Sequence, residues 1–109
     1  MYYVYIIRCE GGELYTGIAS DIGRRMREHF SQSDKCAKYT RSHRAVSLEA
    51  LWTAENRSSA SKLEHRIKRL PRAKKLELIK NPAGASELSE ENEQFTPVEK
   101  FSLEEMLNK

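Results

Sequence analysis

Two runs of β-branched and aromatic residues, joined by a pair of glycines, begin the chain and most constrain its fold. The first run is YYVYIIR over 2–8, and the second covers 13–18. Such runs are typical of strands, and Gly11-Gly12 between them indicates a hairpin turn. The two strands are therefore predicted to pair antiparallel.

An amphipathic helix is predicted directly after this hairpin. Ile22, Met26 and Phe30 recur every four residues and form one apolar stripe over the range 21–31. Ser20 is a suitable N-cap for this helix. The hairpin therefore leads straight into a helix that can cover one face of the sheet.

The next elements complete a small α+β domain. A third strand is predicted over 46–55, a second helix from Ser58 or Ser59, and a short helix over 72–80 that Pro71 starts. The order β-β-α-β-α-α predicts a three-stranded antiparallel sheet flanked by helices.

Charge divides the chain into a basic body and an acidic end. Residues 1–81 carry 17 Lys and Arg against 9 Asp and Glu, whereas residues 82–109 carry 2 Lys against 7 Glu. We therefore expect a folded domain over 1–81 and an acidic, mobile tail over 82–109, with a short helix at 102–108. A polyanion is the expected partner of the body, although the basic residues could simply solvate helix faces.

Composition excludes several classes of protein. A length of 109 residues allows one domain with a modest core, and no apolar run approaches the roughly 20 residues of a membrane helix. Cys9 and Cys36 are isolated, so we expect free thiols in a reducing cytoplasm and no zinc site.

Glu64 is a candidate functional residue because it lies at the edge of the apolar face of the second predicted helix. Burial of an unpaired carboxylate is costly, so the residue needs a partner. Ser61 could form a capping box with it, and Lys68 could form an i,i+4 ion pair. The functional alternative is a ligand for a divalent cation such as Mg²⁺.

Arg25 and His29 lie one helical turn apart beside the apolar stripe of the first helix. A surface role in solvation or ion pairing is one explanation. Phosphate recognition by Arg25, with His29 assisting proton transfer, is the other.

Tyr5 and Tyr15 are predicted to share one face of the hairpin, because both occupy odd-numbered positions on adjacent strands. Tyrosines in strands usually pack the sheet. A phenol could activate water only where a nearby cation assists it, because its ordinary pKa lies near 10.

Several of these features follow one another in a fixed order along the body of the chain. They are YVY at 3–5, YTG at 15–17, Arg25, His29, AKYTR at 37–41 and Glu64 before IKRL. Together they resemble the GIY-YIG nuclease superfamily. The last two features are similar to its small stand-alone bacterial members, which are relatives of the nuclease subunit of a structure-selective endonuclease.

This resemblance implies phosphodiester hydrolysis that depends on Mg²⁺ or Mn²⁺. By position, Tyr5 and Tyr15 match the tyrosines of the two triplets, Arg25 the phosphate-binding arginine, His29 a residue near the attacking water, and Glu64 the metal ligand. The sequence departs from the family where Tyr3 replaces the first glycine and Ile18 replaces a lysine of some relatives. Asn81 is the candidate counterpart of a late asparagine of the family.

The resemblance also implies a surface for nucleic acid. We expect phosphate and base contacts from Lys38, Tyr39, Thr40, Arg41 and Arg44, and a close passage of the chain past a phosphate at Gly17. The predicted function is a cytoplasmic endonuclease of DNA repair or processing, with DNA favoured over RNA and a protein partner for substrate selection. The alternative is a nucleic-acid-binding module with a weak or vestigial site.

Overall fold

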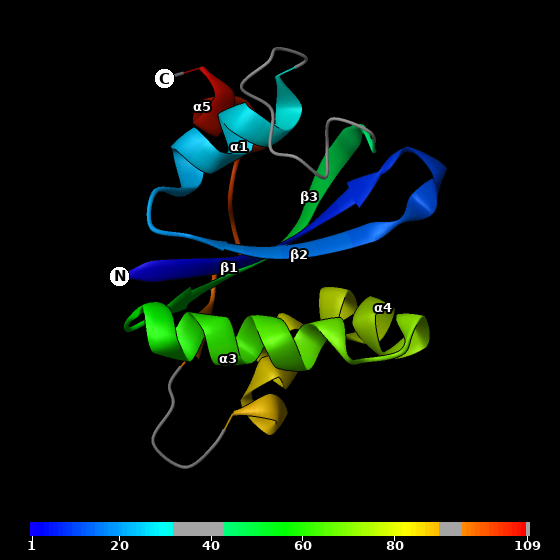
Figure 1. Cartoon of the computed structure of the whole chain (residues 1–109), viewed down its shortest axis with the longest axis vertical. Coiled ribbons are helices and arrows are strands. Elements are labelled where there is room, and N and C mark those ends of the chain that lie inside the picture. Colours follow the sequence, from blue (N-terminus) through cyan, green and yellow to red (C-terminus); the bar gives the residue numbers. More distant parts are fainter. Residues whose placement is uncertain (32–42, 90–94, 109) are drawn as a thin grey trace.

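The computed structural model describes residues 1–31, 43–89 and 95–108, and its centre is an antiparallel sheet (Figure 1). β1 (Tyr2–Cys9) and β2 (Leu14–Ala19) form the N-terminal hairpin. Gly11 and Gly12 turn it with φ values of 87° and 90°, which L side chains rarely adopt. The hairpin is where the sequence predicted it.

The sheet has four strands rather than the three predicted. Its order is β2-β1-β3-β4, where β3 covers Ala45–Ala54 and β4 covers Phe95–Pro97. β4 pairs with the last residues of β3, with Thr96 opposite Thr53. The prediction of three strands was wrong because β4 is short, contains a proline and lies in the acidic C-terminal segment.

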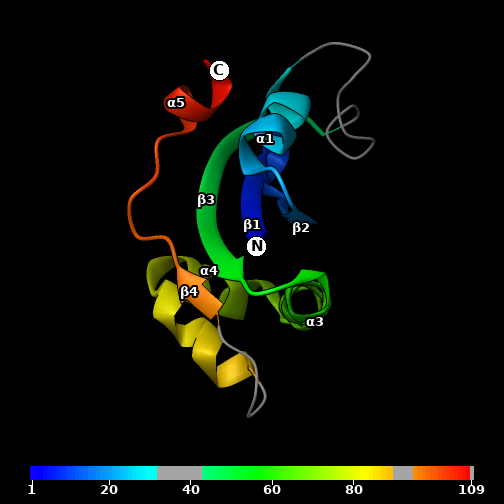
Figure 2. The same ribbon diagram turned by 90° about the vertical axis from the view of Figure 1, so that its left-hand side faces the viewer.

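Helices cover both faces of the sheet (Figure 2). α1 (Ile22–Phe30) and α5 (Leu103–Leu107) lie on one face, and α3 (Arg57–Lys68) and α4 (Arg72–Lys80) on the other. Alternation along β1 divides its side chains between the two cores. Tyr5, Ile7 and Cys9 face the α1 side, and Val4 and Ile6 face the α3 side.

Side-chain caps fix where α1 and α3 begin. Asp21 caps α1 by accepting a hydrogen bond from the backbone N–H of Arg24 at 3.1 Å, so the cap is one residue later than predicted. Asn56 caps α3 by accepting from the N–H of Ser59 at 2.9 Å. Ser61 therefore lies inside α3, and the expected capping box with Glu64 is not formed.

The described residues of the C-terminal segment pack against the body. The 3₁₀ segment Pro82–Leu88 buries Ala85, and the carbonyl of Pro82 accepts a hydrogen bond from the indole N–H of the fully buried Trp52 at 2.8 Å. At the opposite face, Arg27 donates to the carbonyl of Met106 at 3.1 Å and ties α5 to α1. The helix expected at 102–108 corresponds to α5.

Removal of residues 82–109 is expected to lower the free energy of unfolding by at least about 2 kcal/mol. The shortened chain would lose the hydrogen bond from the indole N–H of Trp52 and the apolar contacts of Ala85, Leu88 and Phe95 with the core around it, and burial of one such apolar side chain contributes about 1.5–3 kcal/mol. Urea unfolding of the shortened chain checks this, with a chain lacking only 108–109 as the control. Equal midpoints for the two chains would instead support a mobile tail that contributes nothing to the fold.

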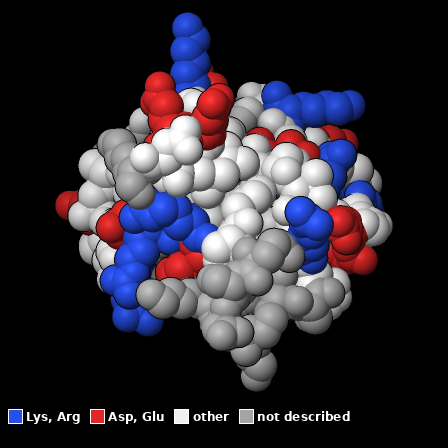
Figure 3. All heavy atoms as spheres, turned by 90° about the horizontal axis from the view of Figure 1, so that it is seen from above, with Lys and Arg blue, Asp and Glu red and all other residues white. Residues whose placement is uncertain are grey.

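Surface charge is unevenly distributed around the α1 and α5 side of the molecule. Seen from above in Figure 3, basic and acidic side chains lie next to one another around an uncharged centre. No described helix is long and apolar enough to cross a membrane. Cys9 is a buried free thiol, and Cys36 lies outside the described residues.

Candidate active site

A buried hydrogen bond joins β1 to α1 at the centre of the candidate site. The hydroxyl of Tyr5 and Nε2 of His29 are 2.6 Å apart, and both side chains are fully buried. Their rings meet edge to face with centroids 5.4 Å apart. The sequence predicted that both residues take part in hydrolysis, His29 near the attacking water. In the structure, both side chains are enclosed within the protein.

Burial keeps both members of this pair neutral. Desolvation raises the pKa of Tyr5, with Tyr15 and Glu64 adding to the rise and the guanidinium of Arg25 opposing it. Desolvation, and then the positive charge of Arg25, lowers the pKa of His29 to about 4. A protonated Tyr5 can therefore donate to a neutral His29 at pH 7.

His29 is expected to make stability depend on pH between 6.5 and 4. The unfolded chain takes up a proton on His29 near pH 6.5, whereas the folded chain resists it until about pH 4. The contribution is fully present above pH 6.5 and is lost as pH falls, by up to about 3 kcal/mol. Urea unfolding against pH should show a shallower slope for His29→Gln than for the wild type.

The exposed His65 offers a matched control for this measurement. The His65→Gln variant should keep the wild-type slope between pH 6.5 and 4. A His29→Gln variant with that same slope would show that His29 is not held neutral by the fold.

Tyr15 lies outside the Tyr5–His29 pair and is only partly buried. Its ring centroid is 6.4 Å from that of Tyr5 and 5.4 Å from that of His29. The ammonium of Lys68 lies over the Tyr15 ring, 5.9 Å from its centroid. Of the two tyrosines, Tyr15 is thus the one that can reach a molecule from solvent, and it has a cation beside it.

Glu64 and Arg25 reach this group from opposite sides. Glu64 projects from α3 past β2, with a side chain 21% exposed and an ion pair to Lys68 at 3.4 Å. Arg25 projects from α1 and forms a half-exposed pair with Glu28 at 3.6 Å. The charges of both affect the ionisation of Tyr5, and Lys68, the ion-pair partner of Glu64, lies over the Tyr15 ring.

Gly17 faces Tyr5 across the hairpin and leaves room for its ring. A Cβ atom at position 17 would fall on the hydroxyl of Tyr5 and lie 2.6 Å from its Cζ. The sequence predicted a close passage of the chain past a phosphate at this glycine. The structure supplies an independent reason for it, which is the space taken by a buried tyrosine.

The other predicted binding residues are elsewhere. Arg44 lies beside the hairpin turn and pairs loosely with Glu10 at 3.9 Å. Asn81 ends α4 and is exposed. The remaining residues lie outside the described part of the chain, and their roles stay predictions: Lys38, Tyr39, Thr40 and Arg41.

Lys68 is the functional candidate that the sequence assigned only a structural role. Its spacing of four residues from Glu64 predicted an ion pair, which is present. Nothing in that spacing indicated a contact with Tyr15, because the contact depends on how α3 lies along β2. The sequence offers one signal for a functional role of Lys68. Some relatives have a lysine where this chain has Ile18, and Lys68 is a lysine close to Glu64 that could take its place.

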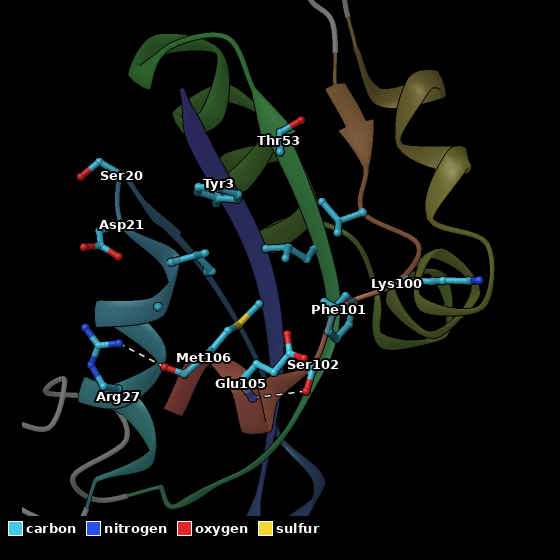
Figure 4. Close-up of a pocket in the computed structure, with 14 residues that line it drawn as sticks. Tyr3, Ser20, Asp21, Arg27, Thr53, Lys100, Phe101, Ser102, Glu105 and Met106 are labelled. Carbon is cyan, nitrogen blue, oxygen red and sulfur yellow. Dashed lines mark hydrogen bonds between the residues drawn. The ribbon is translucent and has the colours of Figure 1, made fainter. Parts of the chain in front are cut away.

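A larger cavity lies away from these residues. It has a volume of about 790 Å³ and lies between the start of α1, the sheet and the C-terminal segment (Figure 4). Tyr3 and Leu51 line it from the strands, and Phe101 and Met106 from the C-terminal segment. None of the predicted site residues that the structure describes lines it, so these residues lie at an open edge rather than in this cavity.

Comparison with known proteins gives a consistent assignment. A family model described as the GIY-YIG catalytic domain matches residues 1–77. A UPF0213 protein of Fusobacterium nucleatum is 44% identical over 81 residues, which are 74% of this chain and 79% of that protein. A UPF0213 protein of Desulfotalea psychrophila is 49% identical over 79 residues, covering 72% of this chain and 71% of that one.

A solved structure is also similar to this chain. It is the solution NMR structure of a UPF0213 protein from Bacillus halodurans, with 36% identity and a TM-score of 0.46. The match covers 79% of this chain and 94% of that one.

Proposed function

Because this chain belongs to the GIY-YIG catalytic domain family, we propose that it is a nuclease that hydrolyses phosphodiester bonds in DNA with Mg²⁺ or Mn²⁺. The family implies nuclease-type chemistry, and the substrates proposed are single-stranded, flapped or branched DNA in repair or processing. The observation that supports this proposal is that Tyr15 lies against the buried Tyr5–His29 pair, with Lys68 between Tyr15 and Glu64 and the charge of Arg25 acting on Tyr5.

The donor set fits a hydrated magnesium ion. Among the described residues, no three His, Cys, Asp or Glu side chains gather into a complete metal site. Mg²⁺ keeps several of its waters and is commonly held by one or two carboxylates together with substrate phosphate. Glu64 would hold the ion through its carboxylate, which now pairs with Lys68. When bound, the ion would act as a Lewis acid toward the phosphate.

Tyr15 is the proposed base, and Tyr5 a positioning residue. Tyr5 is fully buried, so its hydroxyl cannot meet the attacking water, and its bond to His29 fixes both rings behind Tyr15. A water at Tyr15 would attack phosphorus while passing a proton to the Tyr15 oxygen, which releases its own proton to solvent. The bond from phosphorus to the leaving sugar oxygen would break, and that oxygen would take up a proton from solvent. The ammonium of Lys68, 5.9 Å from the centroid of the Tyr15 ring, places a positive charge next to this phenol.

Arg25 is the proposed phosphate-binding residue. Its guanidinium can donate two parallel hydrogen bonds to phosphate oxygens and stabilise the charge that develops there in the transition state. The contact with Glu28 is long and partly exposed, so its exchange for a phosphate costs little.

A cleavage screen tests the proposal. Purified protein is incubated with labelled single-stranded, duplex, flapped and four-way DNA, with Mg²⁺, Mn²⁺ or a chelator, and Glu64→Ala serves as the inactive control. Cleavage that requires the metal and Glu64 is expected. Equal products from wild type and Glu64→Ala would contradict the assignment of the site.

A second function is favoured by the ion pair between Glu64 and Lys68. If the Glu64 carboxylate keeps Lys68 as its partner, the one carboxylate among the predicted site residues is not available to a metal. The protein would then bind nucleic acid without cutting it. Binding that weakens steeply with salt, with no cleavage of any substrate in the screen, would favour this function.

A further inference from the structure

We propose that a pocket between the starts of α1 and α3 binds a second phosphate of the nucleic acid. This inference rests on the proposed function and adds a subsite to it. The pocket has a volume of about 290 Å³ and lies at the end of β2. Three arginines line it: Arg24 and Arg25 from α1 and Arg57 from α3; we call it the arginine pocket.

The fold, rather than local sequence, brings these arginines together. Figure 1 shows α1 and α3 starting at the same end of the sheet, on either side of it. Arg24 stands in the first turn of α1, and Arg57 is the first residue of α3. The two positions are 33 residues apart along the chain. In the sequence, each therefore looks like an ordinary exposed arginine.

Two of the guanidinium groups have no competing partner among the described residues. Within the described ranges, the side chains of Arg24 and Arg57 form no hydrogen bond or ion pair. The pocket also holds two carboxylates. Asp21 is engaged as the cap of α1, and Glu28 is paired with Arg25. The pocket thus keeps one positive charge in excess and two arginines whose donors can turn to a ligand.

The arginine pocket is continuous with the candidate active site because Arg25 belongs to both. Along α3, Arg57 and Glu64 are seven residues apart, or about 10 Å at 1.5 Å per residue. A strand of B-form DNA advances about 3.4 Å per nucleotide. The pocket therefore lies within about one to three nucleotides of a phosphate at Glu64.

Phosphate is the ligand that matches this chemistry. Guanidinium groups bind phosphate oxygens with paired hydrogen bonds, and arginine is the residue best suited to such contacts. Lys68 extends the positive charge one turn beyond Glu64 on α3. A strand lying along the β2 edge would thus meet arginines on one side of the cut and a lysine on the other.

The test measures binding of a short labelled single-stranded DNA to Glu64→Gln protein by fluorescence anisotropy across a salt series. The Arg24→Gln/Arg57→Gln variant should bind about fivefold to tenfold more weakly, and the slope of log affinity against log salt should fall by about 0.7 for each phosphate that the protein no longer binds. The control is Lys62→Gln/Arg69→Gln, which removes the same charge from exposed positions outside the pocket.

A direct arm uses the same DNA with one neutral methylphosphonate, placed in turn at each position. Neutralising the phosphate that binds in the arginine pocket should weaken binding to the parent protein, which is the Glu64→Gln protein with all its arginines. It should not weaken binding to the Arg24→Gln/Arg57→Gln variant of that protein. If the two double variants have equal slopes, or if no methylphosphonate position distinguishes parent from variant, the inference is overturned.

The proposed function is judged separately, by cleavage with the wild-type protein. Cleavage together with unchanged slopes would overturn the second phosphate site alone. A reduced slope without any cleavage would overturn the nuclease function and support the subsite. Absence of any binding to the DNA probe would overturn the subsite whatever the cleavage result.

Discussion

The Glu64→Gln and Arg25→Ala variants are each expected to cut DNA about 10²–10³ times more slowly than the wild type, with the fold retained. Glutamine keeps the shape of Glu64 but removes the charge that would hold the metal ion. Loss of Arg25 removes the guanidinium that stabilises negative charge in the transition state, and groups of this kind typically contribute that factor. Initial rates at saturating DNA, measured with Mg²⁺, check the expectation.

Matched substitutions on exposed positions control for general effects of charge. Glu77→Gln changes a carboxylate on α4, and Arg69→Ala changes an arginine at the end of α3. Both should cut at wild-type rates. A loss of activity in these controls equal to that in Glu64→Gln and Arg25→Ala would show that net charge, and not the site, governs cleavage.

The Gly17→Ala variant is expected to lower the free energy of unfolding by about 2–3 kcal/mol, because its methyl group would enter the space of the Tyr5 ring. The ring cannot move aside cheaply, since it is fully buried and its hydroxyl is bonded to His29. Urea unfolding provides the measurement. Gly84→Ala is the control, because a Cβ there meets only Leu78 at an ordinary 3.7 Å.

A double-mutant cycle tests the cause of this loss. Tyr5→Leu removes the far end of the ring, so Gly17→Ala should cost less in the Tyr5→Leu background, with a coupling of at least about 1 kcal/mol. Additive effects would mean that the methyl group at position 17 clashes with something other than Tyr5.

Local patterns in the sequence were enough to predict most of the fold. The hairpin follows from strand-forming runs around Gly11-Gly12, and the helix over 72–80 from Pro71 and the spacing of apolar residues after it. β4 could not be predicted in this way. It has only three residues, and one of them is proline. It forms because Thr96 pairs with Thr53, which lies 43 residues earlier in the chain.

For the candidate site, the sequence predicted a set of residues but not which of them are buried and which can be reached from solvent. Strand alternation placed Tyr5 and Tyr15 on one face, yet it cannot tell that Tyr5 is enclosed while Tyr15 is not. That difference depends on His29, which the helix brings over Tyr5. Lys68 and the arginine pocket depend likewise on the path of α3 along β2, which no local pattern encodes.

The short strand β4 has a consequence for how copies of this chain behave toward one another. It pairs with Trp52, Thr53 and Ala54 and thereby occupies the backbone hydrogen-bonding groups at the outer edge of β3. An unpaired sheet edge is a template for pairing with another chain and so for aggregation. By covering this end of β3 with its own C-terminal segment, the protein shortens the edge that another chain could pair with, while β2 forms the opposite edge of the described sheet.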